Sequence, residues 1–233
     1  MCRDPGPAAS AAAAVGLWAG ATPHPLDAQG QSAPGAVFQE AQDYAQPYLG
    51  SEDADADIVG LLGAVLAKAK ARLAAASLLQ DYPYECLVHS DHTYDNWVIN
   101  PQKAYLIDWE WAEIGSPAGD LGHFLSPVTV RRHRGQSLPP EDRQFFLQTY
   151  YQALGDATLA QVMKVHFAVF GAFPAVRSLC WTAGYWVTAR RWYAQAGAES
   201  ASAAARLARL ETSRRQFSPM AAEVLAWLEE PLP

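Results

Sequence analysis

The sequence predicts an α+β fold that is predominantly α. Apolar residues recur at helical spacing over most of the chain, and three short β-like runs lie close together in its first half. Half of the 233 residues are apolar and 18% are charged, so the chain is able to bury a sizeable core. Residues 1–35, rich in Ala, Gly, Pro and Ser, are expected to form a poorly ordered tail, and residues 36–233 are expected to form one helical lobe.

Helices are expected on both sides of the β-like runs. The first helix, over residues 36–46, should end before Pro47, and a second stripe of apolar residues at helical spacing predicts a helix over residues 58–79. After the β-like runs, helices are expected over residues 120–125, 141–153, 158–196, 199–217 and 218–227. Pro174 should bend the longest of them, and Ser218 should cap the last.

The β-like runs are short and close together. Residues 86–88, 97–99 and 104–107 read as strands, and the last two flank a turn-like tetrad at residues 100–103. These two strands should therefore form a hairpin. Polar residues between and after the strands should lie in loops held by a rigid frame, where side chains are free to build a site.

A set of polar residues at fixed spacing surrounds these strands. His89 and Asp91 follow the first strand, Asn96 comes five residues after Asp91, and Asp108 follows the third strand. In phosphoryl transfer, one carboxylate accepts the proton of the attacking hydroxyl, while an amide oxygen and a second carboxylate hold Mg²⁺. The spacing matches the kinase pattern H-x-D-x-x-x-x-N followed by a metal-binding Asp. We therefore interpret Asp91 as the catalytic base and Asn96 and Asp108 as metal ligands.

Other polar residues near this loop are interpreted as supports or left open. His89 and Asp120 should hold the loop by hydrogen bonds rather than react, since an Asp at the start of a helix can accept backbone amide hydrogens. Trp109, Trp111 and the acidic residues beside them fit either stacking on a cationic substrate or packing under the loop. The basic run at residues 131–134 fits either a phosphate grip or a solvated loop.

The net charge of −7 is unevenly distributed. Residues 81–120 carry eight acidic residues against Lys103 alone. A cleft lined by carboxylates attracts metal ions and cationic small molecules and repels nucleic acid, although the acidic residues of the motif account for the same count. Three cysteines far apart in sequence indicate a reducing compartment and argue against a disulfide framework. No membrane span is predicted, because no run of about 18 strongly apolar residues occurs.

Three segments together resemble the aminoglycoside phosphotransferase family. His89–Asn96 is similar to its H-G-D-x-x-x-x-N loop, Leu106–Glu110 to its I-D-W-E strand, and Ile114–Gly122 to its G-x-P-x-x-D-L segment. The resemblance covers roughly residues 55–230. It implies a protein-kinase-like fold, ATP and Mg²⁺ as cofactors, and phosphate transfer to a small-molecule hydroxyl.

The resemblance also assigns roles and shows departures. It implies Asp91 as the base and Asn96 and Asp108 as the Mg²⁺ ligands, with the Asp of the third segment supporting the loop. Ser90 replaces the common Gly, and Tyr94–Asp95 replaces the common Pro-Gly. These changes leave the three reacting groups in place, so we expect them to alter loop shape and substrate preference.

The elements that grip the nucleotide are harder to find in this chain. Members of the family carry an N-terminal lobe with a sheet, a phosphate-covering loop and a strand lysine, whereas only 88 residues precede His89 here. None of the four lysines is predicted to lie in a strand; they are Lys68, Lys70, Lys103 and Lys164. We therefore expect a C-terminal lobe with its N-terminal lobe missing, and poor alignment of bound ATP.

The sequence thus predicts an ATP- and Mg²⁺-dependent cytoplasmic phosphotransferase, truncated and weakly active or inactive alone. Its acceptor would be a small-molecule hydroxyl, and a cationic acceptor fits the acidic stretch. No nucleic acid or membrane partner is expected, and a missing lobe would leave an apolar surface that favours self-association. One alternative is a non-catalytic kinase-like binding or scaffold protein. A weaker one is a metal-dependent hydrolase that uses His89, Asp91, His92, Asp95 and Asp108.

Overall fold

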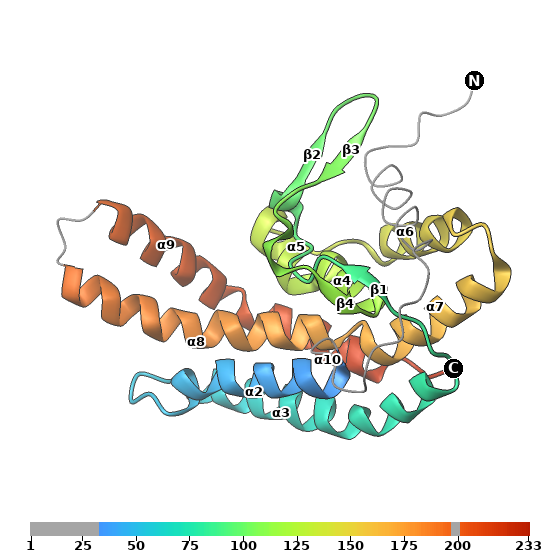
Figure 1. The fold of residues 1–233 in the computed structure, drawn as a ribbon. Coiled ribbons are helices and arrows are strands. Elements are labelled where there is room, and N and C mark those ends of the chain that lie inside the picture. The colour runs from blue at the N-terminus through green and yellow to red at the C-terminus, as the bar shows by residue number, and fades with distance from the viewer. Residues whose placement is uncertain (1–32, 197–200) are drawn as a thin grey trace.

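The structure is a computed structural model that describes residues 33–196 and 201–233, and most of these residues are helical (Figure 1). The tail expected at residues 1–35 falls outside the described residues up to residue 32. In chain order the elements are α2 (Pro34–Leu49), α3 (Ala56–Arg72), η1 (Leu73–Gln80), β1 (Cys86–Val88), η2 (Tyr94–Asn96), β2 (Trp97–Ile99), β3 (Ala104–Leu106), η3 (Trp109–Trp111), β4 (Glu113–Gly115), α4 (Pro117–Leu125), α5 (Pro127–Arg134), α6 (Pro140–Ala153), α7 (Ala157–Phe170), α8 (Phe173–Ala196), α9 (Ala201–Arg215) and α10 (Phe217–Glu229), where η denotes a 3₁₀ helix. The predicted α+β, predominantly α class is confirmed.

Helix α8 is the centre of the fold. It packs along α2 and also contacts α3, α4, α5, α9 and α10. Figure 1 shows it crossing the molecule with α2 and α3 along one side and α4 and α5 on the other. Its core-facing residues, which include Val176, Leu179, Cys180 and Val187, are buried. Each fully buried aliphatic side chain contributes about 1.5–3 kcal/mol, so burial of this face holds the helices together.

The first two helices differ in extent from the prediction. Helix α2 includes Pro47 in its last turn, so the expectation that the helix ends before Pro47 is wrong. The proline lies near the helix end, where one missing backbone hydrogen bond is offset by burial of the neighbouring Tyr48. The helix predicted over residues 58–79 divides into α3 and the 3₁₀ helix η1. Asp55 caps α3 by accepting a hydrogen bond from the backbone N–H of Asp57 at 3.1 Å.

The later helices are also shifted at their ends. The helix predicted over residues 158–196 is interrupted at residues 171–172, just before Pro174. It forms two helices, α7 and α8, and Pro174 is the second residue of α8. A proline is tolerated in a first turn, because its missing N–H would have had no helical partner there. The N-cap position of the last helix is Gln216 rather than Ser218, and the Gln216 side chain makes no capping hydrogen bond. The basic run at residues 131–134 is the last turn of a helix, α5, and not a loop.

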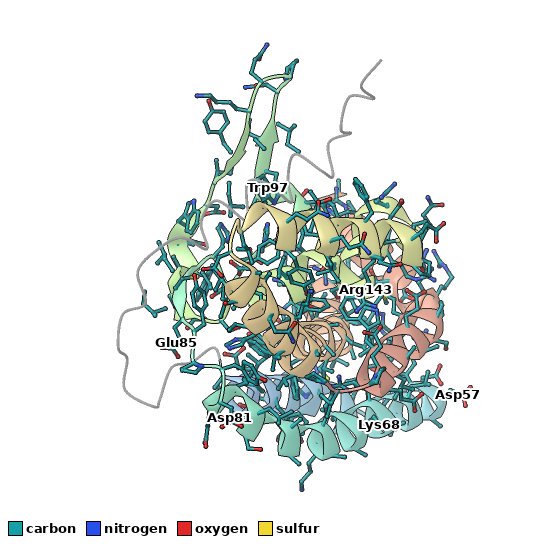
Figure 2. All side chains as sticks on the ribbon, turned by 90° about the vertical axis from the view of Figure 1, so that its right-hand side faces the viewer. Asp57, Lys68, Asp81, Glu85, Trp97 and Arg143 are labelled. Atoms are coloured by element: carbon teal, nitrogen blue, oxygen red, sulfur yellow. The ribbon has the colours of Figure 1, made fainter. Side chains whose placement is uncertain are left out.

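Two antiparallel ladders frame the predicted catalytic loop. Strand β2 pairs with β3, which confirms the hairpin, and the side chain of Asn100 accepts hydrogen bonds from two backbone N–H groups of its turn at 2.8 and 3.0 Å. Strand β1 pairs with β4, a strand that was not predicted, with Leu87 opposite Ile114. The hairpin projects from the helical body (Figure 1), and Trp97 lies at its base (Figure 2). Residues 89–96 are therefore anchored at both ends by strands.

One described stretch is long and apolar enough by composition to cross a membrane. It is Ala157–Gln195, which covers α7 and most of α8. In the protein, 67% of its most apolar window is buried, as expected for the core helices of a globular fold. Packing against the other helices therefore accounts for its composition.

Candidate active site

The loop after β1 is fastened to helix α4 by Asp120. The Asp120 carboxylate accepts the backbone N–H of His89 at Oδ2 (2.8 Å) and that of Ser90 at Oδ1 (2.9 Å). Burial raises the pKa of Asp120 to about 6, and the two amide hydrogen bonds oppose this rise. Above this pH, Asp120 is a buried carboxylate with both oxygens used to hold the loop.

His89 joins the loop to the strand that follows the hairpin. Its Nε2 lies 2.7 Å from the carbonyl oxygen of Ile107, and since a carbonyl only accepts, Nε2 carries the proton and donates. The N–H of Ile107 in turn donates to the carbonyl oxygen of Asn96 at 2.9 Å. The buried His89 ring also meets the Trp109 ring edge-on, with centroids 4.9 Å apart. The residue before Asp108 is thus bonded to both ends of the loop.

Ser90 makes a sharp backbone turn directly before Asp91. Its φ of +64° lies in the left-handed region, which costs a non-glycine residue roughly 1 kcal/mol or more. The Ser90 hydroxyl donates to Glu113 Oε1 at 2.7 Å, and its carbonyl oxygen accepts from Arg177 at 3.2 Å. Arg177 also pairs with Glu40 of α2 at 3.2 Å. These contacts hold the strained turn in place.

The structure brings Asp91 and Asn96 together. The side-chain nitrogen of Asn96 donates to the backbone oxygen of Asp91 at 2.8 Å and to its carboxylate Oδ2 at 3.2 Å. Asn96 is buried and Asp91 is half-buried. Because the amide nitrogen faces Asp91, the Asn96 Oδ1 atom remains as an acceptor for a cation.

Asp108 stands apart from this pair in its side-chain contacts. It is exposed, and its side chain forms no hydrogen bond or ion pair within residues 33–196 and 201–233. Its backbone is left-handed, with φ +65° and ψ +57°. The hydrogen bond from Ile107 to Asn96 keeps its backbone beside the loop. The structure therefore places the Asp108 backbone near Asn96 without a side-chain contact to Asn96 or Asp91.

The donor set suits Mg²⁺ better than a tightly coordinated transition metal. Asn96 Oδ1 and the Asp108 carboxylate are the oxygen donors that would hold Mg²⁺, which usually takes one or two protein ligands and completes its shell with phosphate and water. In the part of the chain that the structure describes, no three His, Cys, Asp or Glu side chains gather as a metal site. The described residues therefore do not form a site in which protein side chains alone would hold a metal ion.

One of the histidines proposed as a metal ligand in the hydrolase alternative, His92, is buried in the core. His92 is fully buried, stacked on Phe124 with centroids 4.9 Å apart and close to Trp97 at 5.3 Å. Burial lowers the pKa of His92 to about 3, and the neighbouring His89 lowers it further in the same direction. Asp95 points the other way and is exposed. His92 and Asp95 therefore do not converge on a common metal ion.

Asp91 lines a cleft of about 680 Å³ between the loop, the η3–β4 segment, α2 and α8. A volume of this size suits a small molecule. The charged residues along it are Glu40, Asp91, Glu110, Glu113, Arg132 and Arg177. Carboxylates thus outnumber guanidinium groups by two, and we call this site the acidic cleft. Three of the eight acidic residues of segment 81–120 line the acidic cleft, and Glu40 of α2 adds a fourth carboxylate.

Aromatic side chains complete the acidic cleft. Trp111 lines it and is 66% exposed, whereas Trp109 packs on His89 under the loop. Tyr44 of α2 and Trp181 of α8 line the same cleft. Exposed aromatic faces next to carboxylates are suited to a cationic group.

Comparison with known proteins identifies the chain's family. Residues 8–164 match the model of the phosphotransferase enzyme family. The chain belongs to this family. The resemblance inferred from the loop, the Asp108 strand and the segment before Asp120 is therefore confirmed. No curated protein matches the sequence.

Solved structures place this phosphotransferase family member among kinase-like folds. A choline kinase from Cryptosporidium parvum Iowa II superposes with a TM-score of 0.54 at 11% identity, over 96% of this chain and 66% of its own. A choline/ethanolamine kinase family protein from Mesorhizobium loti gives 0.50 at 18% identity, over 94% and 67%. An aminoglycoside phosphotransferase from Alicyclobacillus acidocaldarius gives 0.45 at 19% identity, over 96% and 67%. The chain spans about two thirds of the length of these structures, and the first two confirm the predicted kinase-like fold.

The sequence did not reveal which distant residues close the acidic cleft of this phosphotransferase family member. Glu40 and Tyr44 come from α2, and Arg177 and Trp181 come from α8. Their spacing, four residues apart in each helix, was visible but is common to any helix that presents one face. Only the packing of α2 along α8 shows that these two faces meet at Asp91.

Proposed function

We propose that this protein is a small-molecule kinase that transfers a phosphoryl group from a nucleoside triphosphate to a hydroxyl. Asp91 accepts the proton of the attacking hydroxyl as the hydroxyl oxygen forms a bond to the terminal phosphorus. The bond from that phosphorus to the bridging oxygen breaks, and nucleoside diphosphate leaves. Asn96 and Asp108 hold Mg²⁺, which would neutralise the phosphate charge when bound. His89 and Asp120 keep the loop in shape. The observation that carries the proposal is the position of Asp91, hydrogen-bonded to Asn96 and lining the acidic cleft.

The acceptor is proposed to be a cationic small molecule with a free hydroxyl. The carboxylate excess of the acidic cleft and the exposed Trp111 ring favour a positively charged group at a distance from the reacting oxygen. The same negative charge repels nucleic acid. We propose a cytoplasmic location, because a kinase needs a supply of nucleoside triphosphate.

Weak activity of this chain alone is part of the proposal. Lys68 and Lys70 lie in α3, Lys103 in the hairpin turn and Lys164 in α7, so none is available as a strand lysine to grip phosphates. Residues 33–85 of the described chain hold only helices and loops before β1. We propose that residues 36–233 form the helical lobe of the fold, in which the described residues supply no strand lysine to grip phosphates. Calorimetric titration with Mg²⁺-ATP should give weak binding, and low-micromolar affinity would contradict this point.

Self-association is proposed from the exposed hairpin. Val98, Ile99, Tyr105 and Ile107 are each 44–49% exposed along the projecting strands. Exposed apolar strands of this kind tend to pair with another copy or another domain. Sedimentation velocity of the wild type and of a Val98→Lys/Tyr105→Lys variant would show whether the hairpin mediates it.

The catalytic role is tested by comparing two carboxylates of one loop. Asp91→Asn keeps the side-chain shape and should abolish phosphate transfer from ATP to amino-alcohol acceptors, because the base is lost. Asp95→Asn is the matched control: Asp95 is exposed in the same loop and pairs with His133 at 3.4 Å. It should retain activity. Product formation is measured by mass spectrometry over long incubations, and equal turnover by both variants would refute the role of Asp91.

The same pair of variants distinguishes the kinase from the non-catalytic scaffold alternative. The absence of a strand lysine among the described residues favours it. A non-catalytic module would show no turnover in the wild type, and its affinity for a cationic ligand would change little in Asp91→Asn. A kinase loses turnover in Asp91→Asn while its melting temperature stays near that of the wild type.

A further inference from the structure

A second cleft lies on the other side of Arg132 and Trp181, which line both clefts. It has a volume of about 840 Å³ and is formed by α5, α8 and α9, with contributions from η2 and the start of α10. Its charged and titratable residues are Asp95, Arg131, Arg132, His133, Arg206 and Arg209. Guanidinium groups outnumber carboxylates by four to one, so we call it the basic cleft. Its charge is opposite to that of the acidic cleft.

Part of this positive charge is already neutralised. Arg131 forms a close ion pair with Glu223 of α10, and Asp95 faces His133 with 3.4 Å between the nearest atoms. Asp95 also lies near Arg132, where its charge opposes the lowering of the Arg132 pKa by burial. The Arg131–Glu223 ion pair joins α5 to α10. Because Arg131 is already paired, it would add little to the binding energy of an anion.

Two guanidinium groups, those of Arg206 and Arg209, have no carboxylate partner within the described residues. Arg132 is near the carboxylates of Asp91 and Asp95 and donates to the Thr182 hydroxyl at 3.4 Å. Arg132 lies over the Trp181 ring at 4.9 Å, and Arg206 lies over the Trp192 ring at 5.3 Å. Arg209 follows Arg206 by one helical turn on α9, so both project from the same face. A guanidinium stacked by its flat face keeps its N–H edge free to donate, and this edge matches the oxygens of phosphate or carboxylate.

The apolar part of the wall is also preorganised. Trp181 and Tyr185 stack nearly parallel, with ring centroids 4.6 Å apart and 14° between planes. This stack holds the Arg132 side chain from below through the Trp181 ring. An open cleft with four guanidinium groups against one carboxylate, beside a stacked aromatic pair, is arranged to receive negative charge, since Arg206 and Arg209 have no carboxylate partner in the described wall.

We propose that the basic cleft binds a small polyanion through Arg132, Arg206 and Arg209. The occupant is a molecule with two or more phosphate or carboxylate groups, because the positive charge of the cleft comes from two helices, α5 and α9. A small molecule fits better than nucleic acid, since the cleft is of small-molecule volume and the whole chain carries −7. The basic run seen in the sequence at residues 131–134 contributes through one residue, Arg132.

The site is independent of phosphate transfer. Arg206 and Arg209 do not line the acidic cleft, so changing them leaves the Asp91 loop untouched. Arg132 lines both clefts and is therefore left intact in the test. Binding is measured without nucleotide or Mg²⁺, so its outcome does not depend on catalytic activity.

The test titrates the full chain with inorganic pyrophosphate and, separately, with citrate, followed by calorimetry. We expect saturable binding of at least one of them, and the stronger one tells whether phosphate or carboxylate is preferred. The Arg206→Gln/Arg209→Gln variant should bind at least about tenfold more weakly. Gln keeps the helix propensity of α9, and circular dichroism checks that the helical content is unchanged.

A matched control removes two positive charges elsewhere. Lys70 of α3 and Arg191 of α8 are exposed and do not line the basic cleft. The Lys70→Gln/Arg191→Gln variant should bind within about twofold of the wild type. Three outcomes would overturn the proposal: no saturable binding of either anion up to about 10 mM, equal loss in both double variants, or no loss in the α9 variant.

Discussion

Gly184 lies where α8 crosses α2, and the fold depends on its having no side chain. A Cβ added at Gly184 would come closer than 3.0 Å to the carbonyl oxygen of Tyr44 and would lie 3.2 Å from the carbonyl carbon. It would also contact Pro47 at 3.7 Å. The obstacle is backbone, which cannot rotate aside as a side chain can. The two helices therefore approach each other only because this position is glycine.

Gly184→Ala should destabilise the protein by at least about 2 kcal/mol. The added methyl group gains about 1 kcal/mol of helix propensity but forces α2 and α8 apart by on the order of 1 Å, at an overpacking cost of about 3 kcal/mol. For a chain of this length the melting temperature should fall by roughly 4–8 °C. Because Tyr44 also lines the acidic cleft, acceptor binding should weaken as well.

The control is a glycine in another helix. Gly63 lies exposed in α3, and an added Cβ there would meet no atom within 4 Å. Gly63→Ala should therefore stabilise the protein by about 0.5–1 kcal/mol through helix propensity alone. Thermal unfolding followed by circular dichroism, checked by denaturant titration, measures both variants. If Gly184→Ala were as stable as Gly63→Ala, the close approach of α2 and α8 would be wrong.

Three further predictions concern the loop and the core. Ser90→Gly should be about 1–2 kcal/mol more stable than Ser90→Ala, because both lose the hydroxyl but only Gly relieves the positive φ; equal stabilities would contradict that strain. His92 stays neutral when buried, with its pKa near 3. Its contribution to the free energy of unfolding is therefore complete above about pH 6.5 and is lost progressively as the pH falls below that value. At pH 5 the free energy of unfolding should be about 2 kcal/mol lower for this reason, and His92→Phe should remove this loss. Protonation of Asp120 below its pKa of about 6 stabilises the folded state in both the wild type and the variant, and therefore acts in the opposite direction. Arg72 donates to three backbone carbonyls of α7 and the C-terminal residues at 2.6–2.9 Å, so Arg72→Met should cost at least about 3 kcal/mol, against under about 1 kcal/mol for the exposed Lys68→Met.

The geometry of the loop that carries Asp91 and Asn96 could be predicted from the sequence because it depends on local spacing. Asp91 and Asn96 lie five residues apart within one loop, and the hairpin that brings Asp108 back is closed by a local turn. Short segments of this kind are determined by turn residues and β-branched runs that a sequence displays directly. The helical class was predictable for the same reason, since amphipathic spacing is local.

The walls of both clefts could not be predicted, because they depend on contacts between distant helices. Glu40 meets Arg177 across 137 positions, and Arg131 meets Glu223 across 92. Neither pair has a local signal. Pro47 misled the prediction for a related reason: a proline near a helix end is tolerated when burial of the neighbouring residues offsets one lost hydrogen bond.

Backbone strain and costly burial are concentrated around the proposed catalytic residues. Among residues 33–196 and 201–233, only Ser90 and Asp108 have a positive φ without being glycine, and they lie beside Asp91 and at a proposed metal ligand. The buried Asp120 carboxylate, with its raised pKa, supports the same loop. A module that only needs a stable fold gains nothing from these features, whereas a site that must hold Asp91 in one orientation does. The distribution of strain thus favours the kinase proposal over the scaffold alternative, independently of the sequence motif.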